Sequence, residues 1–160
     1  KRLQMFLMVA ILGGLLLAAC SNDEPKLVEP TLTANEMIDE MLTKVEQPMF
    51  MEVTADQVKE IYNIDPEKLE DYAIRIPMMN VKTNEISILK VKDAADVSAV
   101  EEALKQRAQT VQQQFETYLP DQYENAKNYK LVTKGNYVLF VISDQADELV
   151  AEYDHFFNKQ

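Results

Sequence analysis

The sequence predicts an α+β domain organised around a mainly antiparallel four-stranded sheet. Two stretches, 72–91 and 129–142, each contain two runs of branched and aromatic residues around a short polar turn, which is the pattern of a β-hairpin. Between the hairpins, apolar residues recur every three or four positions for about 25 residues, which indicates one long helix. Shorter segments with helical spacing precede the first hairpin and follow the second, so further helices are expected at both ends.

The first twenty residues predict export and lipid attachment. Lys1 and Arg2 precede an apolar run of about 15 residues, whereas a membrane-spanning helix needs about 20. The run ends in Leu-Ala-Ala-Cys at 17–20, which is similar to the bacterial lipobox, where a signal peptidase cuts before a cysteine that carries diacylglycerol. Cys20 is the only cysteine of the chain, so an internal disulfide is excluded. We predict a signal peptide over residues 1–19 and acyl chains such as palmitate on Cys20; the alternative is an uncleaved transmembrane anchor.

The predicted mature chain is strongly acidic. The whole chain has 16 basic and 27 acidic residues, and the signal peptide holds two of the basic ones and no acidic one, so 14 basic residues remain and the net charge becomes −13. Such a charge argues against a nucleic-acid partner and against electrostatic attachment to anionic lipid. The acyl chains are therefore expected to hold the protein on the extracytoplasmic face of the cell membrane.

Residues 20–32 are predicted to form a flexible tether, and residues 33–158 a single domain. The tether contains polar residues and two prolines and has little to bury. The domain is expected to begin with two helices, because capping-box sequences start at Thr33 and at Thr54. Pro48 is expected to end the first of these helices.

Asp65-Pro66 is expected to start a short helical turn before the first hairpin. In the first strand, 72–78, apolar and polar residues alternate, so one face should be buried. Pro77 cannot donate a hydrogen bond to a neighbouring strand, which favours an edge position. After the returning strand, 86–91, the long helix is predicted from Asp93 until Pro120. Its apolar stripe consists of Val97, Val100, Leu104, Ala108, Val111, Phe115 and Tyr118.

The second hairpin is predicted to pair 129–133 with 137–142 around Gly135-Asn136, a dipeptide typical of tight turns. The strand 137–142 is apolar on both faces, so we expect it inside the sheet with layers on both sides. Ser143-Asp144 is predicted to cap the last helix. The residues of this helix that are expected to face the core are Ala146, Leu149, Val150, Tyr153 and Phe157.

The predicted mature chain has few residues of the types that common catalytic sites need. Gly135 is its only glycine, so a phosphate-binding loop is not expected. His155 is the only histidine, which argues against a zinc cluster and makes a Ser-His-Asp triad a poor alternative. Acylation of Cys20 removes the one thiol. We expect no cofactor and no catalysis, although a cell-envelope hydrolase with two carboxylates stays open, because such pairs meet only in the fold.

Four methionines form two close pairs, Met49 with Met51 and Met78 with Met79. Thioethers are soft ligands for Cu(I), so methionine-based copper binding is a second alternative function. Methionine is also an adaptable filler of hydrophobic cores. Because no histidine is near and no longer run of alternating methionines occurs, we predict that these four residues fill the core.

Arg107 lies at the border of the apolar stripe of the long helix, three residues after Leu104 and four before Val111. A guanidinium in such a place needs carboxylates, carbonyls or water to satisfy its donors. We predict a partly buried Arg107 paired with a carboxylate; the alternative is a role in anion or peptide binding. For ligand binding, the predicted residues are Arg107, Asn136 and Tyr137, on one surface with the exposed turn of the second hairpin.

Several segments resemble one bacterial protein family. They are residues 85–92, Arg107, Phe115, Tyr118-Leu119-Pro120, the Lys-Gly-Asn-Tyr-Val hairpin at 134–138 and Ser143-Asp144. From Thr33 to Phe157 the chain is similar to the bacterial lipoprotein family catalogued as domain of unknown function 4358. The resemblance implies a membrane lipoprotein with no assigned activity, and it transfers no catalytic residue. We predict a lipid-anchored extracytoplasmic domain that binds or scaffolds an envelope protein or a cell-wall component.

Overall fold

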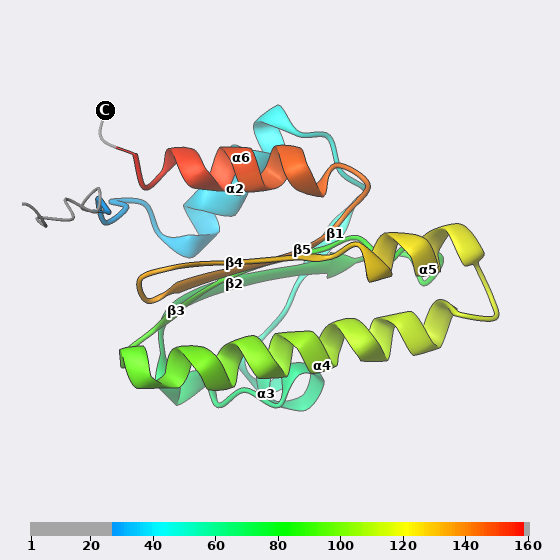
Figure 1. Cartoon of the computed structure of the whole chain (residues 1–160), viewed down its shortest axis with the longest axis horizontal. Coiled ribbons are helices and arrows are strands. Elements are labelled where there is room, and N and C mark those ends of the chain that lie inside the picture. Colours follow the sequence, from blue (N-terminus) through cyan, green and yellow to red (C-terminus); the bar gives the residue numbers. More distant parts are fainter. Residues whose placement is uncertain (1–26, 159–160) are drawn as a thin grey trace, which may run out of the picture.

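The computed structural model describes residues 27–158, and the predicted signal peptide, Cys20 and most of the predicted tether lie outside this part of the chain. The described residues form three layers, with a sheet between two layers of helices (Figure 1). The helices are α2 (Ala34–Lys44), α3 (Ala55–Tyr62), α4 (Val97–Phe115), α5 (Pro120–Lys127) and α6 (Ala146–His155), with short 3₁₀ helices η1 (Pro66–Lys68) and η2 (Ala94–Asp96). The strands are β1 (Phe50–Glu52), β2 (Leu69–Pro77), β3 (Glu85–Val91), β4 (Lys130–Lys134) and β5 (Tyr137–Ile142). None of these helices combines the length and the apolar character that crossing a bilayer requires.

The strands form one antiparallel sheet in the order β1-β2-β3-β5-β4. The predicted α+β class and the two predicted hairpins, β2–β3 and β4–β5, are confirmed. The predicted number of four strands is wrong, because β1 adds a fifth strand beside β2. With only 3 residues, β1 is too short for an alternating pattern to be recognised in the sequence.

The predicted edge position of the strand that contains Pro77 is also wrong. β2 lies between β1 and β3, and β1 is the edge strand. Pro77 is the last residue of β2 and lies opposite Phe50. The next pair along is joined by a hydrogen bond from Met78 N to Met49 O at 3.0 Å. Hydrogen-bonded and non-hydrogen-bonded pairs alternate in an antiparallel ladder, so the pair of Pro77 and Phe50 is not hydrogen-bonded. The missing N–H of Pro77 therefore costs no hydrogen bond with β1.

Helices α2 and α6 cover one face of the sheet, and α3 and α4 cover the other (Figure 1). The strand β5 is buried along its whole length and has β3 and β4 as neighbours, so its predicted interior position is confirmed. The core under α2 and α6 includes Met37, Ile38, Met41, Ile86, Ile88, Leu139, Leu149 and Tyr153. The core under α3 and α4 includes Val58, Leu89, Leu104, Val111, Phe115 and Phe140.

The long helix is shorter than predicted. α4 ends at Phe115, and the N–H groups of Tyr118 and Leu119 both donate to the Phe115 carbonyl, at 3.1 Å each. Pro120 then begins α5 instead of ending α4, because a proline at the start of a helix needs no partner for its missing N–H. Tyr118 is therefore exposed and is not part of the apolar stripe. The sequence does not reveal α5 because this helix is mostly polar and fully buries only Ala126.

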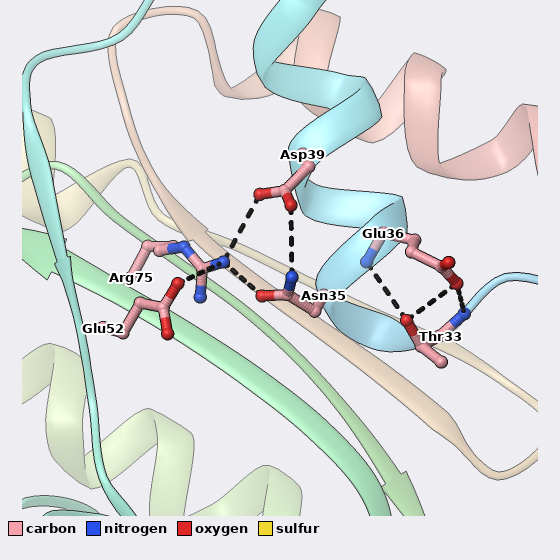
Figure 2. A network of polar contacts seen from close by, with 6 residues as sticks. All are labelled: Thr33, Asn35, Glu36, Asp39, Glu52 and Arg75. Atoms are coloured by element: carbon pink, nitrogen blue, oxygen red, sulfur yellow. Dashed lines mark hydrogen bonds and ion pairs between the residues drawn. The ribbon is translucent and has the colours of Figure 1, made fainter.

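The first two helices begin where their capping residues predict. In α2, Thr33 N donates to Glu36 Oε2 at 2.8 Å, and Glu36 N donates to Thr33 Oγ1 at 3.3 Å, which completes a capping box (Figure 2). In α3, Thr54 N donates to Gln57 Oε1 at 2.9 Å. These bonds satisfy backbone groups that a helix terminus leaves without partners.

The last helix begins later than predicted. α6 starts at Ala146, and the residue before its first turn is Gln145 rather than Ser143 or Asp144. Ser143 Oγ instead accepts a hydrogen bond from Gln145 N at 3.0 Å, within the turn that links β5 to α6. The predicted cap is therefore wrong, and Ser143 belongs to a polar cluster at the end of the sheet.

Candidate functional site

Arg107 and Glu85 form a buried ion pair between α4 and β3. Arg107 Nη2 donates to Glu85 Oε2 at 2.8 Å, and Arg107 Nε lies 3.2 Å from each oxygen of the same carboxylate. The Tyr62 hydroxyl donates to Glu85 Oε1 at 2.5 Å, and the Arg107 guanidinium lies 5.4 Å from the centre of the Tyr62 ring. The side chain of Glu85 is 1% exposed and that of Arg107 is 14% exposed. The predicted partly buried Arg107 with a carboxylate partner is confirmed.

These three residues, which we call the Glu85 cluster, favour a charged arginine and a protonated tyrosine. Burial lowers the pKa of Arg107, but the charge and hydrogen bonds of Glu85 more than offset this effect, so the pKa is raised. Burial, and after it the charge of Glu85, raises the pKa of the Tyr62 phenol well above its ordinary value. The cluster joins α3, α4 and β3, and its enclosed carboxylate accepts hydrogen bonds from two side chains, Tyr62 and Arg107. We therefore assign it a structural role.

Arg75 makes a second buried polar contact on the opposite face of the sheet (Figure 2). Its Nη2 donates to Asn35 Oδ1 and lies 3.3 Å from Asp39 Oδ1 and 3.2 Å from Glu52 Oε1. Because these partners belong to α2 and β1, Arg75 links both elements to β2. This arginine is also structural.

Asn136 and Tyr137 lie at the turn between β4 and β5, where Gly135 has a φ of +56°. Tyr137 is buried, since its ring meets the Phe157 ring edge-on at 5.3 Å and Lys90 Nζ lies 5.2 Å from its centre. A cavity of about 240 Å³ beside the turn is lined by both residues and by the first described residues of the chain. Its Lys90 is already paired with Glu29 at 2.7 Å and with Glu70 at 2.8 Å.

The three predicted binding residues do not share one surface. Arg107 reaches β3 at Glu85, which lies opposite Ile142 of β5, whereas Tyr137 lies opposite Lys90 at the other end of β3. Tyr137 also packs into the core under α2 and α6, while Arg107 belongs to the layer of α4 on the other face. Sequence periodicity places each residue on its own element, but it does not show which ends of the strands meet.

A large concave feature with polar walls lies at the end of the sheet where β3 begins and β5 ends. This end cleft has a volume of about 720 Å³ and is formed by the segments that join α2 to β1, β2 to β3 and β5 to α6, together with α5. Five carboxamide side chains line it: Gln47, Asn84, Gln122, Asn125 and Gln145. The charged residues in its wall are Glu46, Lys82, Asp121 and Asp144.

Gln47 is the centre of the hydrogen-bond network on one wall of the end cleft. Its Oε1 accepts from Asn84 Nδ2 at 3.1 Å and from Ser143 Oγ at 2.9 Å, and its Nε2 donates to Gln145 Oε1 at 3.2 Å. Asn84 and Ser143 are buried at the ends of β3 and β5. The side chain of Gln47 is therefore held by three partners on two segments, the one before β3 and the one that links β5 to α6.

A second network fixes α5 against the start of β3. Thr83 N donates to Gln122 Oε1 at 3.0 Å, Thr83 Oγ1 donates to the Gln122 carbonyl at 3.2 Å, and Asn125 Nδ2 donates to Thr83 Oγ1 at 3.1 Å. Both networks hold carboxamides in defined orientations before any ligand arrives. Such groups offer a donor and an acceptor side by side, which suits peptide amides and sugar hydroxyls.

Sequence reasoning missed the end cleft because its residues come from four separate segments. The signal that was present is the run of polar residues at the strand ends, Thr83-Asn84 before β3 and Ser143-Asp144 after β5. Each pair reads locally as a turn or a helix cap, and only the sheet topology brings the two pairs together.

The prediction that the four paired methionines fill the core is wrong. Met49 is 73% exposed, Met51 43%, Met78 56% and Met79 51%. Met51 lies on β1, Met49 directly precedes this edge strand, and Met78 and Met79 follow β2. Within residues 27–158, no three side chains of the His, Cys, Asp and Glu types are placed to hold a metal ion.

Comparison with known proteins places the chain in a family without giving it an activity. The family model described as Domain of unknown function (DUF4358) matches residues 43–143, from the end of α2 to the end of β5. No curated protein and no solved structure matches the chain significantly. The matched region contains the whole Glu85 cluster and most of the end cleft. The chain therefore belongs to the DUF4358 family, as its resemblance in sequence predicted.

Proposed function

We propose that this protein is a lipid-anchored extracytoplasmic binding domain and that the end cleft binds its partner, an envelope protein or a cell-wall component. The observation that carries the proposal is the end cleft itself. Its volume of about 720 Å³ lies within the range of about 300–1,000 Å³ typical of ligand sites. Its carboxamides are oriented in advance by their own hydrogen bonds, which lowers the entropy lost on binding.

The position of the end cleft relative to the predicted anchor suits such a role. The first described residues pack beside the β4–β5 turn, with Val28 N donating to the Phe157 carbonyl at 3.4 Å and Glu29 paired with Lys90. β5 runs from that turn to the end cleft, over about 20 Å. Cys20 precedes the first described residue by seven positions, a span of at most about 25 Å. An acylated Cys20 would keep the β4–β5 turn within about 25 Å of the membrane, and the end cleft lies at the opposite end of β5.

The charged side chains of the end cleft favour binding over hydrolysis. A two-carboxylate hydrolase needs one carboxyl group whose surroundings keep it protonated, usually an apolar pocket. Glu46, Asp121 and Asp144 are all exposed to solvent. With Lys82 as the one lysine of the wall, the end cleft has an excess of negative charge, which favours a partner segment that is polar and positively charged.

The anchor is tested by replacing Cys20 with alanine in the full chain. We expect Cys20→Ala to abolish incorporation of a labelled fatty acid and to release the protein from the membrane fraction, because the cysteine thiol is the attachment point of the lipid. The domain should remain folded, which circular dichroism of the released protein would check. Acyl labelling of the Cys20→Ala chain would contradict the proposal and favour a transmembrane anchor.

The end cleft is tested by reversing its charge. In living cells, a photo-reactive residue at position 82 should crosslink the domain to a protein partner, and we expect Asp121→Lys with Asp144→Lys to abolish the crosslinked products. If the partner is a cell-wall component, the same double variant should no longer co-sediment with purified cell walls. The matched control is Glu102→Lys with Glu148→Lys, which changes the net charge equally on exposed positions of α4 and α6 outside the end cleft. Equal recovery of the partner by both double variants would show that the end cleft is not the binding site.

A further inference from the structure

The exposed methionines are arranged by the β1–β2 ladder, independently of the end cleft. In this ladder Met51 lies opposite Ile76, and the hydrogen bond from Met78 N to Met49 O extends the same register to the pair Met49–Met78. Side chains two positions apart on a strand point to the same face, and directly opposed residues share a face. Met49, Met51 and Met78 therefore project from one face of the sheet, together with Ile76.

This face is the one that α3 and α4 cover further along the same two strands. Val53 N donates to the Ile74 carbonyl at 3.1 Å, two pairs further in than Met51–Ile76, and both side chains are buried in the core under α3 and α4. Exposure then rises outward along the strand, from 7% at Val53 to 43% at Met51 and 73% at Met49. The apolar stripe thus continues past the helices, and its uncovered end consists of thioether side chains.

The register brings three sulfur atoms within reach of one ion. Opposed residues such as Met49 and Met78 have Cβ atoms about 4.5–5.5 Å apart, and diagonal neighbours such as Met51 and Met78 are about 7–8 Å apart. Methionine has three rotatable bonds, so side chains at these separations converge without movement of the backbone. Leucine or isoleucine would give the same hydrophobic surface, whereas only methionine adds a soft, uncharged donor.

The neighbourhood selects for a soft cation rather than for a hard or borderline one. Glu52, the carboxylate next to Met51, projects to the other face, where it pairs with Arg75. His155 lies on α6, beyond the other face of the sheet, 3.6 Å from Glu152. This carboxylate and this imidazole therefore do not complete the thioether set, and thioethers alone favour Cu(I) over Zn(II) or Cu(II).

We propose that Met49, Met51 and Met78 form a surface binding site for Cu(I), with Ag(I) as a redox-inert substitute. The site lies where the chain enters β1 and leaves β2. Binding needs no redox step, because the three sulfurs donate lone pairs to an ion that keeps its oxidation state. Met79, which follows in the turn, is outside this pairing and is not a ligand.

The test follows methionine methyl signals in the full chain, held in detergent micelles without chloride. The protein carries ¹³C-labelled methionine methyl groups, assigned by single Met→Leu variants, and Ag(I) nitrate is added in stoichiometric amounts. We expect the signals of Met49, Met51 and Met78 to shift, while those of the buried Met37 and Met41 do not. Zn(II) at the same concentration should shift none of the three, and Cu(I) kept reduced by ascorbate should act as Ag(I) does.

The matched variants separate sulfur chemistry from surface shape. Met49→Leu with Met51→Leu and Met78→Leu keeps the volume and the apolar character of the surface, so thermal unfolding should be unchanged while the affinity for Ag(I) falls at least about tenfold. Met79→Leu should bind as the parent does. The proposal fails if the three signals do not respond to Ag(I), if the triple variant binds as tightly as the parent, or if the signals respond only to protein concentration, which would indicate self-association.

Discussion

Replacing Glu85 with alanine is expected to lower the free energy of unfolding by about 3–5 kcal/mol, because it leaves a buried charge without its partner. Arg107 would lose all its hydrogen bonds to Glu85, and the Tyr62 hydroxyl would lose its acceptor in the same enclosed space. Urea unfolding of the full chain in micelles, with linear extrapolation to water, measures the change.

The double variant Glu85→Leu with Arg107→Met distinguishes the charge from the packing. Apolar residues that replace both members of a buried pair are often neutral or stabilising, so the double variant should be more stable than Glu85→Ala alone. Glu124→Ala, which removes an exposed ion pair with Lys127, serves as the control and should leave stability unchanged. A loss of less than about 1 kcal/mol in Glu85→Ala would mean that water screens the Glu85 cluster.

Phe140→Ala should destabilise the domain by about 3–5 kcal/mol, the usual effect of truncating a buried phenylalanine. Phe140 is fully buried in β5, and its ring lies 5.7 Å from that of Tyr129. Its side chain belongs to the core that contains Leu104 and Val111 of α4. The cavity left by alanine would therefore lie between the sheet and the long helix.

The control for this prediction is Tyr118→Ala, in the turn after α4. Tyr118 is 62% exposed, so removing its ring should change the unfolding midpoint little. The same urea titration compares the two variants, with the slope of each curve reporting whether the unfolded states are alike. Similar losses in both would contradict the observed end of α4 at Phe115 and place Tyr118 in the apolar stripe.

Local signals in the sequence were sufficient for most of the elements. The capping residues Thr33 and Thr54 mark the starts of α2 and α3 because a cap bonds to backbone groups only two or three residues away. The Gly135-Asn136 turn marks the second hairpin because a tight turn has its own backbone requirements. Arg107 was recognised as partly buried from its place beside the helical stripe, although its partner Glu85 was not identified.

The misplaced elements are those whose state depends on distant contacts. β1 has 3 residues and exists because β2 offers it an edge to pair with. Pro120 was expected to end a helix, but the same residue begins α5, and proline is compatible with both positions. The methionines were assigned to the core because hydrophobicity alone does not reveal where the covering helices end.

Residues that are neighbours along the chain specify the α+β class, the two hairpins and the caps of α2 and α3, and they also carry the expectation of a lipid anchor. The strand order, the partner of Arg107, the exposure of the methionine pairs and the end cleft become visible only in the folded chain. These features depend on contacts between distant segments, because strand pairing assembles both the end cleft and the methionine face. Gln47, Thr83 and Ser143 are far apart in sequence, and β3 and β5 bring them to one end of the sheet.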